Sequence, residues 1–243
     1  MKKIFGRKPI LEALKAKENI EQIYVSYGLK GDVIYQIKNL AKKNGIKYSE
    51  VSTSKFKEID PGKNTQGIIA LKSDRKYYSI DELLKSFKKE NPLILCLDSI
   101  QDPHNVGAIL RTAECAGVDG IIITTHNSAP ITETAEKISA GAVSHLKICK
   151  VNNLNHAMGI LKEDGFWITG TALAENSKDF TEIDYRGKTA IIMGNEEKGL
   201  KSLVAKNCDF LAEIPMQGQI QSLNVSVATG VILFEALKQR NNS

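Results

Sequence analysis

The chain has 243 residues, of which 42% are apolar and 25% are charged, a composition typical of a soluble globular protein. No apolar run approaches the roughly 18 residues that a membrane helix needs, so we expect no membrane partner. The basic N-terminus, Met1 to Lys8, runs into further charged residues before the apolar core of a signal peptide develops, which indicates a cytoplasmic protein.

The cysteines and histidines do not follow a metal-site pattern. The four cysteines contain no Cys-x-x-Cys pair, and no two of the four histidines stand four residues apart. We therefore expect no metal, and we expect buried, free thiols. The thiols are those of Cys96, Cys115, Cys149 and Cys208.

Positive charge is concentrated in the first third of the chain. Residues 1–73 contain 15 Lys or Arg and 7 Asp or Glu, a net charge of +8, whereas residues 74–243 contain 18 and 21, a net charge of −3. Cationic side chains bind nucleic acids because they release condensed counterions from the phosphates. A nucleic-acid partner and a solvated lysine-rich surface are both consistent with this charge, and charge alone does not separate them.

Residues 1–73 predict a compact α/β unit. Pro9–Leu14 has proline near a first helical turn and apolar residues at helical spacing, and Ile20–Ser26 alternates like a strand. A second helix is expected over Asp32–Lys43, and further strands over Lys47–Val51 and Gln66–Leu71.

The aromatic residues of this unit have two candidate roles. They either stack on RNA bases or pack in the core, and for most of them we expect core packing. The residues concerned are Phe5, Tyr24, Tyr27, Tyr35, Tyr48 and Phe56.

Residues 74–92 are polar and charged around a short amphipathic piece, Ile80–Phe87, and are expected to form a linker. Over 93–243, apolar strands alternate with helices, which is typical of a parallel sheet covered on both faces. The expected strands are Leu93–Leu97, Gly120–Thr125, Phe166–Thr171, Thr189–Met193 and Phe210–Ile214. The expected helices are Val106–Ala116, Glu133–Ser144 and Val225–Lys238.

Three polar segments follow predicted strands of this domain, where open α/β sheets place their ligands. They cover residues 97–113, 191–200 and 214–228. The sequence lacks the glycine-rich dinucleotide fingerprint, the P-loop and the nucleophile elbow. A dinucleotide-dependent oxidoreductase, a P-loop NTPase and an α/β hydrolase are therefore disfavoured.

The polar residues of these segments have a structural and a functional interpretation. In the structural one, Asn105, Ser222 and Asn224 cap helices, Gly194 permits a turn and Arg111 forms an ion pair. In the functional one they form a common site into which Arg111 faces. Their concentration in three strand-end segments favours the site.

In order and spacing, the three segments resemble the motifs of the SpoU branch of the SPOUT RNA methyltransferases. The matching residues are Asp102 to Gly107 with Arg111, then Gly194, Asn195 and Glu196, and finally Ile214 to Ala228. The second motif departs mildly, because Glu197 stands where many members have glycine.

The N-terminal unit resembles the small substrate-binding domain of the same family, which is similar to the ribosomal L30e fold. That domain begins with Gly-Arg-x-Pro and Glu-Ala and closes with Gln-Gly-Ile. The matching residues are Gly6 to Pro9, Glu12 with Ala13, and Gln66 to Ile68. The resemblance thus covers essentially the whole chain.

The resemblance implies an α/β fold in which a parallel-sheet SPOUT domain with a deep trefoil knot follows a small L30e-like α/β domain. It also implies a homodimer whose active site is completed across the interface. The implied cofactor is S-adenosyl-L-methionine, bound in the knot mainly by backbone groups. The residues implied to bind it are Thr171, Gly194, Ile214, Met216 and Leu223.

For catalysis, the resemblance implies Arg111, Asn105, Glu196, Ser222 and Asn224. A guanidinium keeps its proton in proteins and is a poor base. We therefore expect Arg111 to bind the adjacent phosphate and to stabilise the developing alkoxide, with Asn105 and Glu196 orienting it. Ser222 and Asn224 either hydrogen-bond the substrate ribose or fix the loop.

The predicted function is methyl transfer to a ribose 2′-hydroxyl in structured RNA, with a guanosine of 23S rRNA as the expected target. The alternatives are a tRNA ribose 2′-O-methyltransferase, an rRNA methylase that confers antibiotic resistance, and a non-catalytic RNA-binding protein that keeps the fold. Loss of Arg111 or blockage of the loop at Gly194 would favour the last, and the sequence retains both.

Overall fold

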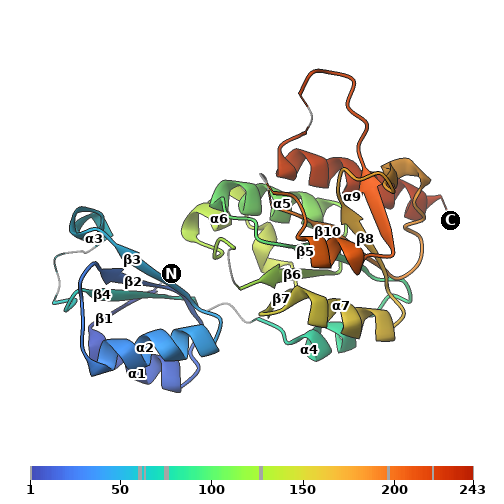
Figure 1. The fold of residues 1–243 in the computed structure, drawn as a ribbon. Coiled ribbons are helices and arrows are strands. Elements are labelled where there is room, and N and C mark those ends of the chain that lie inside the picture. The colour runs from blue at the N-terminus through green and yellow to red at the C-terminus, as the bar shows by residue number, and fades with distance from the viewer. Residues whose placement is uncertain are drawn as a thin grey trace. The chain divides into compact units, whose positions relative to one another are not determined.

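The computed structural model describes residues 2–59, 62, 64–73, 77–125, 128–195, 198–220 and 222–242. The chain folds into two compact units, residues 1–76 and residues 77–243 (Figure 1). Each unit has its own sheet, and the first unit has one hydrophobic core whereas the second has two. Among the described residues, no helix is both long and apolar enough to cross a membrane.

The first unit is a four-stranded sheet with strand order β1-β4-β2-β3. Strands β2 and β3 are parallel, and the other two pairs are antiparallel. The elements are β1 (Lys2–Phe5), α1 (Arg7–Lys15), β2 (Ile20–Ser26), α2 (Asp32–Lys43), β3 (Lys47–Val51), α3 (Thr53–Ile59) and β4 (Ile68–Lys72). The predicted bounds of β2, α2 and β3 are confirmed to the residue, whereas β1 and α3 were not predicted.

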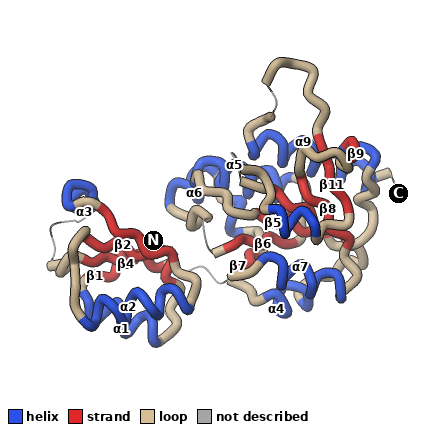
Figure 2. The backbone as a smooth tube through the Cα atoms, viewed as in Figure 1, coloured by secondary structure: helices blue, strands red, loops and turns tan. Residues whose placement is uncertain are grey.

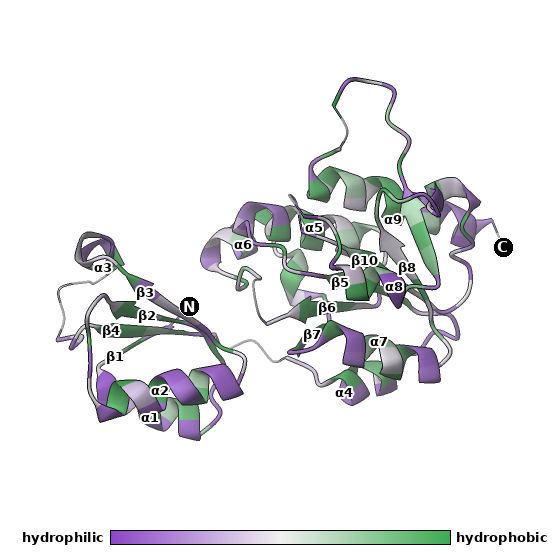
Figure 3. Cartoon of the chain, viewed as in Figure 1, coloured by the Kyte–Doolittle hydropathy of each residue, from purple (hydrophilic) through white to green (hydrophobic). Residues whose placement is uncertain are grey.

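Apolar spacing explains helix α2. Its Ile34, Ile37 and Ala41 share one face and are buried in the core of this unit, where α2 packs against α1. Gly45, with a φ of 65°, follows the helix and adopts the left-handed conformation that ends many helices. The hydrophilic colour of α2 in Figure 3 marks the residues that face solvent.

The second unit is a seven-stranded parallel sheet between two layers of helices (Figure 2). The strands, in spatial order, are β7 (Ile148–Val151), β6 (Gly120–Thr124), β5 (Leu93–Leu97), β10 (Thr189–Met193), β8 (Trp167–Thr171), β11 (Phe210–Glu213) and β9 (Lys178–Asp179). The helices are α4 (Ile80–Lys85), α5 (Pro103–Cys115), α6 (Glu133–Ile138), α7 (Leu154–Glu163), α8 (Ser202–Lys206) and α9 (Val225–Asn241), with 3₁₀ turns at Ala142–Ser144 and Phe180–Glu182.

Alternating strand residues face two separate cores. Leu95 and Leu97 of β5 pack with residues of α5 and α9, whereas Ile94 and Cys96 pack with residues of α4 and α7. Because both faces of the sheet are covered, its central strands are continuous apolar runs. The parallel sheet predicted from these runs is confirmed.

Residues 80–85, expected to lie in a linker, form helix α4 of the second unit. Ser79 caps the helix, since its Oγ accepts a hydrogen bond from Glu82 N while Ser79 N donates to the Glu82 carboxylate at 2.8 Å. Leu83 is buried in the core. This short helix therefore contributes to the packing of the second unit.

Helix α5 begins three residues earlier than predicted, because Asp102 is its N-cap. The Oδ1 atom of Asp102 accepts a hydrogen bond from His104 N at 2.8 Å. Pro103 occupies the first helical turn, where the N–H that proline lacks would have no partner within the helix. The interpretation of Asn105 as the cap is therefore wrong, and its side chain makes a tertiary contact instead.

The thiols differ in their exposure. Cys96 and Cys149 are buried, Cys208 is partly buried, and Cys115 at the end of α5 is exposed, contrary to expectation. Burial raises the pKa of Cys149 and of Cys208 to about 12, so both stay protonated at neutral pH. Within the described ranges, no group of three or more His, Cys, Asp or Glu residues could hold a metal ion.

The strand order brings the three polar segments to one edge of the sheet. Strand β10 lies between β5 and β8, so the chain after Met193 runs beside the chain after Leu97. Strand β11 pairs with the other side of β8. Segments that are far apart in the sequence therefore leave the sheet side by side.

Candidate active site

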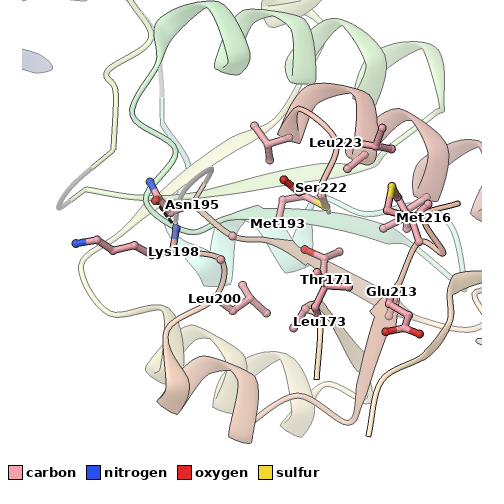
Figure 4. A pocket seen from close by; sticks show the side chains of 18 residues that line it. Thr171, Leu173, Met193, Asn195, Lys198, Leu200, Glu213, Met216, Ser222 and Leu223 are labelled. Carbon is pink, nitrogen blue, oxygen red and sulfur yellow. Dashed lines mark hydrogen bonds between the residues drawn. The ribbon is translucent and has the colours of Figure 1, made fainter. Parts of the chain in front are cut away.

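A cavity of about 480 Å³ lies beyond the ends of β8, β10 and β11, beside the start of α9. Figure 4 shows that its side chains come from separate segments of the second unit. The residues predicted to bind the cofactor all line this cavity, namely Thr171, Gly194, Ile214, Met216 and Leu223. Ser222 lines it as well.

The wall of this cavity combines apolar and polar side chains. Met193, Val225 and Ile232 contribute to the wall. Lys198 extends away from the cavity on one side in Figure 4, and Glu213 lies on the other. A pocket of this size, lined by apolar side chains together with several polar ones, lies within the range of small-molecule sites.

Gly194 allows the loop that closes the cavity to fold back on itself. A Cβ atom at this position would lie 2.5 Å from the carbonyl carbon of Gly199 and 2.6 Å from Leu200 N. Backbone hydrogen bonds of 3.0 Å and 2.9 Å join Asn195 and Gly199 across the turn, and Asn195 Oδ1 accepts from Lys198 N at 3.1 Å (Figure 4). We call residues 194, 195 and 198–200 the closing loop.

Three hydrogen bonds tie the closing loop and the residue after it to the segment after β5. Asn195 Nδ2 donates to the carbonyl oxygen of Ser99 at 3.0 Å. Just beyond the loop, Lys201 Nζ lies 2.7 Å from Asp98 Oδ1 and 2.9 Å from Ser99 Oγ. Ser99 has a φ of 64°, a conformation that serine rarely adopts. These contacts hold the first and second motifs in a fixed relation.

Sequence reasoning missed Asp98, Ser99 and Lys201. Asp98 is only 1% exposed although it directly follows the apolar strand β5. A charged residue at the end of a buried strand is the one local signal that could have identified it. The identity of its partner depends on the strand order, which the sequence does not reveal.

A second cavity of about 780 Å³, lined mainly by residues with polar or charged side chains, lies on the other side of the closing loop. It shares Asn195, Lys198 and Leu200 with the first cavity, and Gln101 and Asn105 also line it. The closing loop is therefore a wall common to both cavities.

The first and third motifs meet through a pair of asparagines. Asn224 Nδ2 donates to Asn105 Oδ1 at 3.0 Å. Asn224 is also the N-cap of α9, because its Oδ1 accepts from Ser226 N at 2.8 Å and from Ser226 Oγ at 2.6 Å. The cap interpretation of Asn224 is thus confirmed, and the asparagine pair adds a link between segments that are distant in the sequence.

Arg111 lies on the exposed side of α5. The apolar residues Val106, Ile109 and Leu110 of this helix are buried against the sheet. Among the residues that the structure describes, Arg111 lines neither cavity. The expectation that Arg111 faces inward is therefore wrong for the single chain, and its catalytic role stays a prediction. Glu196, expected to orient it, lies outside the described residues.

Comparison with known proteins identifies both units. The model of the SpoU rRNA methylase family matches residues 92–234, and the model described as RNA 2′-O ribose methyltransferase substrate binding matches residues 3–78. A Bacillus subtilis (strain 168) protein assigned to the TrmH family of tRNA/rRNA methyltransferases, YacO, is 35% identical over 98% of this chain and 96% of its own length.

Solved structures agree with this assignment. The AdoMet-bound rRNA methyltransferase from Sinorhizobium meliloti has a TM-score of 0.62 and 28% identity, and covers 97% of this chain and 86% of its own. The TrmH/SpoU tRNA modifying enzyme of A. aeolicus has a TM-score of 0.59 and 36% identity, and covers 67% of this chain and 83% of its own. Because family models match both units and close relatives span nearly the whole chain, the protein belongs to the SpoU family of RNA methyltransferases.

Proposed function

We propose that this chain transfers the methyl group of S-adenosylmethionine to a ribose 2′-hydroxyl, and that the target is a guanosine of 23S rRNA. The observation that carries the proposal is the convergence of all three family motifs at one edge of the sheet, where the closing loop and Leu223 line one cavity. The Asn105–Asn224 hydrogen bond joins the first motif to the third.

The lining of the 480 Å³ cavity fits the cofactor. Its volume falls within the roughly 300–1,000 Å³ of small-molecule sites, and the apolar side chains of its wall suit an adenine ring. Gly194 has no side chain to occupy the space, and Ile214 and Leu223 line it. When bound, the cofactor supplies a methyl group on a sulfonium, which is activated for displacement. The deep trefoil knot is part of the proposal, because the segment after β11 returns to the same cavity as the closing loop.

The protein's contribution to methyl transfer is positioning and charge stabilisation. Holding two reactants in line can lower a barrier by about 7–11 kcal/mol. In the proposed mechanism, Arg111 binds the phosphate next to the target ribose and stabilises the alkoxide that forms as the 2′-hydroxyl gives up its proton to solvent water. Asn105 and Glu196 orient Arg111, and Ser222 borders the cavity where the ribose oxygen must approach.

A homodimer would bring Arg111 to a cavity. Val227 and Phe234 of α9 are 51% and 50% exposed, and their spacing of seven residues places them on one face of the helix. Helix α9 packs against α5, which carries the exposed Arg111. In the proposed dimer this face is the interface, and each Arg111 serves the cavity of the other subunit.

Mixed dimers test whether the site is composite. Arg111→Ala removes the cation, and Thr171→Trp fills the cavity with an indole. Random mixing of the two variants makes half of the dimers mixed. If each site uses Arg111 from one subunit and Thr171 from the other, every mixed dimer has one intact site out of two, and the mixture regains about a quarter of the wild-type activity. If mixing restores no activity although light scattering shows dimers, the composite site is wrong.

The RNA target is tested by mass-spectrometric mapping of ribose methylations in rRNA and tRNA from a strain that lacks the gene. Loss of one 2′-O-methylguanosine from 23S rRNA supports the proposal. Loss of a tRNA methylation supports the tRNA alternative instead.

Calorimetry with S-adenosylmethionine addresses the non-catalytic alternative, since a scaffold protein would show no binding. Cytoplasmic location is part of the proposal.

A further inference from the structure

Two tyrosines of the first unit are largely exposed. Tyr27 is 77% exposed and Tyr35 is 68% exposed, whereas Phe56 of the same unit is buried and Tyr48 packs against the core. Core packing therefore does not explain Tyr27 or Tyr35. The alternative role for an aromatic ring in a basic unit is stacking on a nucleic-acid base.

The backbone around Tyr27 is held in place on both sides. Tyr27 N donates to the carbonyl oxygen of Val51 at 2.8 Å, and Ser26 N donates to that of Gly67 at 2.9 Å. Leu29 packs beneath Gly67, where an added Cβ would lie 3.3 Å from a Leu29 methyl carbon. A ring presented from a fixed backbone loses little conformational freedom when it binds.

Cationic side chains border the same loop. Arg7 N donates to Gln66 Oε1 at 3.0 Å, and Arg7 Nη1 lies 3.7 Å from the position of a Cβ on Gly31. The Arg7 guanidinium therefore lies against the end of the loop that begins at Tyr27. Lys30 lies within this loop and is exposed.

Three acidic residues elsewhere in the unit form ion pairs with lysines. Glu12 pairs with Lys15, Glu18 with Lys72 and Glu50 with Lys38, at 2.8 to 3.0 Å. In the part of the chain that the structure describes, none of these carboxylates neutralises Arg7 or Lys30. Asp32, at the start of α2, is the acidic neighbour in the sequence, and the loop region remains net positive.

Resting on the RNA methyltransferase function proposed above, we infer that Tyr27 stacks on an unpaired base of the substrate RNA while Arg7 and Lys30 bind the flanking phosphates. An unpaired loop is the favoured partner, because its bases expose the faces that a duplex hides. The family model over residues 3–78 carries the description substrate binding, which agrees with this surface but names no residue.

Tyr35 provides a matched control. It is the same residue type, in the same unit, with similar exposure. It lies on the outer face of α2, because Ile34 and Ile37 turn the opposite face to the core. Tyr35→Ala removes the same aromatic ring but leaves the side chains of the loop that begins at Tyr27 unchanged.

The experiment measures binding of the full-length protein to a fluorescein-labelled RNA stem-loop with a mixed-sequence loop and to a blunt duplex of the same stem. Tyr27→Ala should weaken stem-loop binding about 5- to 150-fold, the equivalent of one lost base stack, without changing duplex binding. Tyr27→Phe should retain binding, and Tyr35→Ala should bind as the wild type does.

Salt titration separates stacking from charge. Lys30→Gln should lower the slope of log affinity against log salt by about 0.7, the value for one phosphate contact on a single strand, whereas Tyr27→Ala should leave the slope unchanged. The inference is overturned if Tyr27→Ala binds the stem-loop normally, or if it weakens stem-loop and duplex equally. Equal losses in Tyr27→Ala and Tyr35→Ala would also overturn it.

The measurements distinguish failure of the proposed function from failure of the stacking inference. If the wild-type protein binds neither RNA and methylates no rRNA or tRNA, the proposed function fails. If the wild type binds and methylates while Tyr27→Ala does so equally well, only the stacking inference fails. Circular dichroism of each variant checks that the unit remains folded.

Discussion

Lys201 Nζ lies 2.7 Å from Asp98 Oδ1, and this ion pair joins the end of the closing loop to the end of strand β5. The pair is asymmetric, because Asp98 is 1% exposed and the Lys201 side chain is 57% exposed. The carboxylate thus depends on the lysine for compensation of its buried charge, together with the hydroxyl of Ser99.

Lys201→Met should destabilise the protein by about 1–3 kcal/mol, because it leaves a buried carboxylate without its cation. It should also weaken cofactor binding, since the closing loop loses one of its ties. Urea unfolding and calorimetry measure the two effects, and Lys201→Arg should restore much of both. The control Lys15→Met breaks an ion pair whose carboxylate, that of Glu12, is 69% exposed, and should change stability by no more than about 1 kcal/mol. Equal effects of the two methionine variants would contradict the prediction.

Gly194→Ala should abolish cofactor binding. Its Cβ would lie within 2.7 Å of backbone atoms of Gly199 and Leu200, so the closing loop cannot keep its turn. The control is Gly187→Ala, where an added Cβ has no neighbour within 4 Å among the described residues. Calorimetry with S-adenosylmethionine should show binding to the control alone; binding to Gly194→Ala with wild-type affinity would show that the loop is adaptable.

Arg111→Ala should lower kcat by about 10²- to 10³-fold, the loss expected when one group that stabilises a developing oxyanion is removed. Cofactor affinity should stay near the wild-type value, because the proposed role of Arg111 is to bind the substrate phosphate and the developing alkoxide, not the cofactor. Arg111→Lys should recover only part of the rate, since an ammonium cannot form the two parallel bonds of a guanidinium. Methyl transfer to RNA and calorimetry provide the measurements, and a variant that retains most of its turnover would refute the catalytic role.

Two substitutions at Asn224 should separate its structural role from its role in the site. Asn224→Ala removes both the α9 cap and the hydrogen bond to Asn105, and should cost about 0.5–2 kcal/mol of stability. Asn224→Ser keeps a capping hydroxyl but is too short to maintain the asparagine link. We expect near-normal unfolding and reduced methylation for the serine variant. Normal methylation would limit Asn224 to the cap.

Iodoacetamide at pH 8 should modify Cys115 alone in the folded protein. Cys115 is exposed, whereas burial raises the pKa of Cys149 and Cys208 to about 12 and leaves almost no thiolate at that pH. Peptide mass spectrometry identifies the alkylated site, and unfolding in urea should expose all four thiols. Early modification of Cys149 would show that the sheet opens locally around it.

The amino-acid sequence by itself determined the elements whose pattern is local. Helix α2 and strands β2 and β3 were predicted to the residue, because apolar spacing and turn residues act over a few positions. A short helix such as α4 has too few apolar positions to indicate burial. The packing of α4 in the core between the sheet and α7 could therefore not be predicted. The three motifs were also recognisable, since each is a contiguous stretch.

Only the tertiary structure decided which of these stretches meet and where their side chains lie. The insertion of β10 between β5 and β8 creates the contact of Lys201 with Asp98 and the position of the closing loop. The same fold turns Arg111 to the exposed side of α5, opposite to the orientation expected from its sequence. Strand order and helix orientation depend on packing between residues far apart in the chain. The local periodicity of the sequence does not predict those contacts.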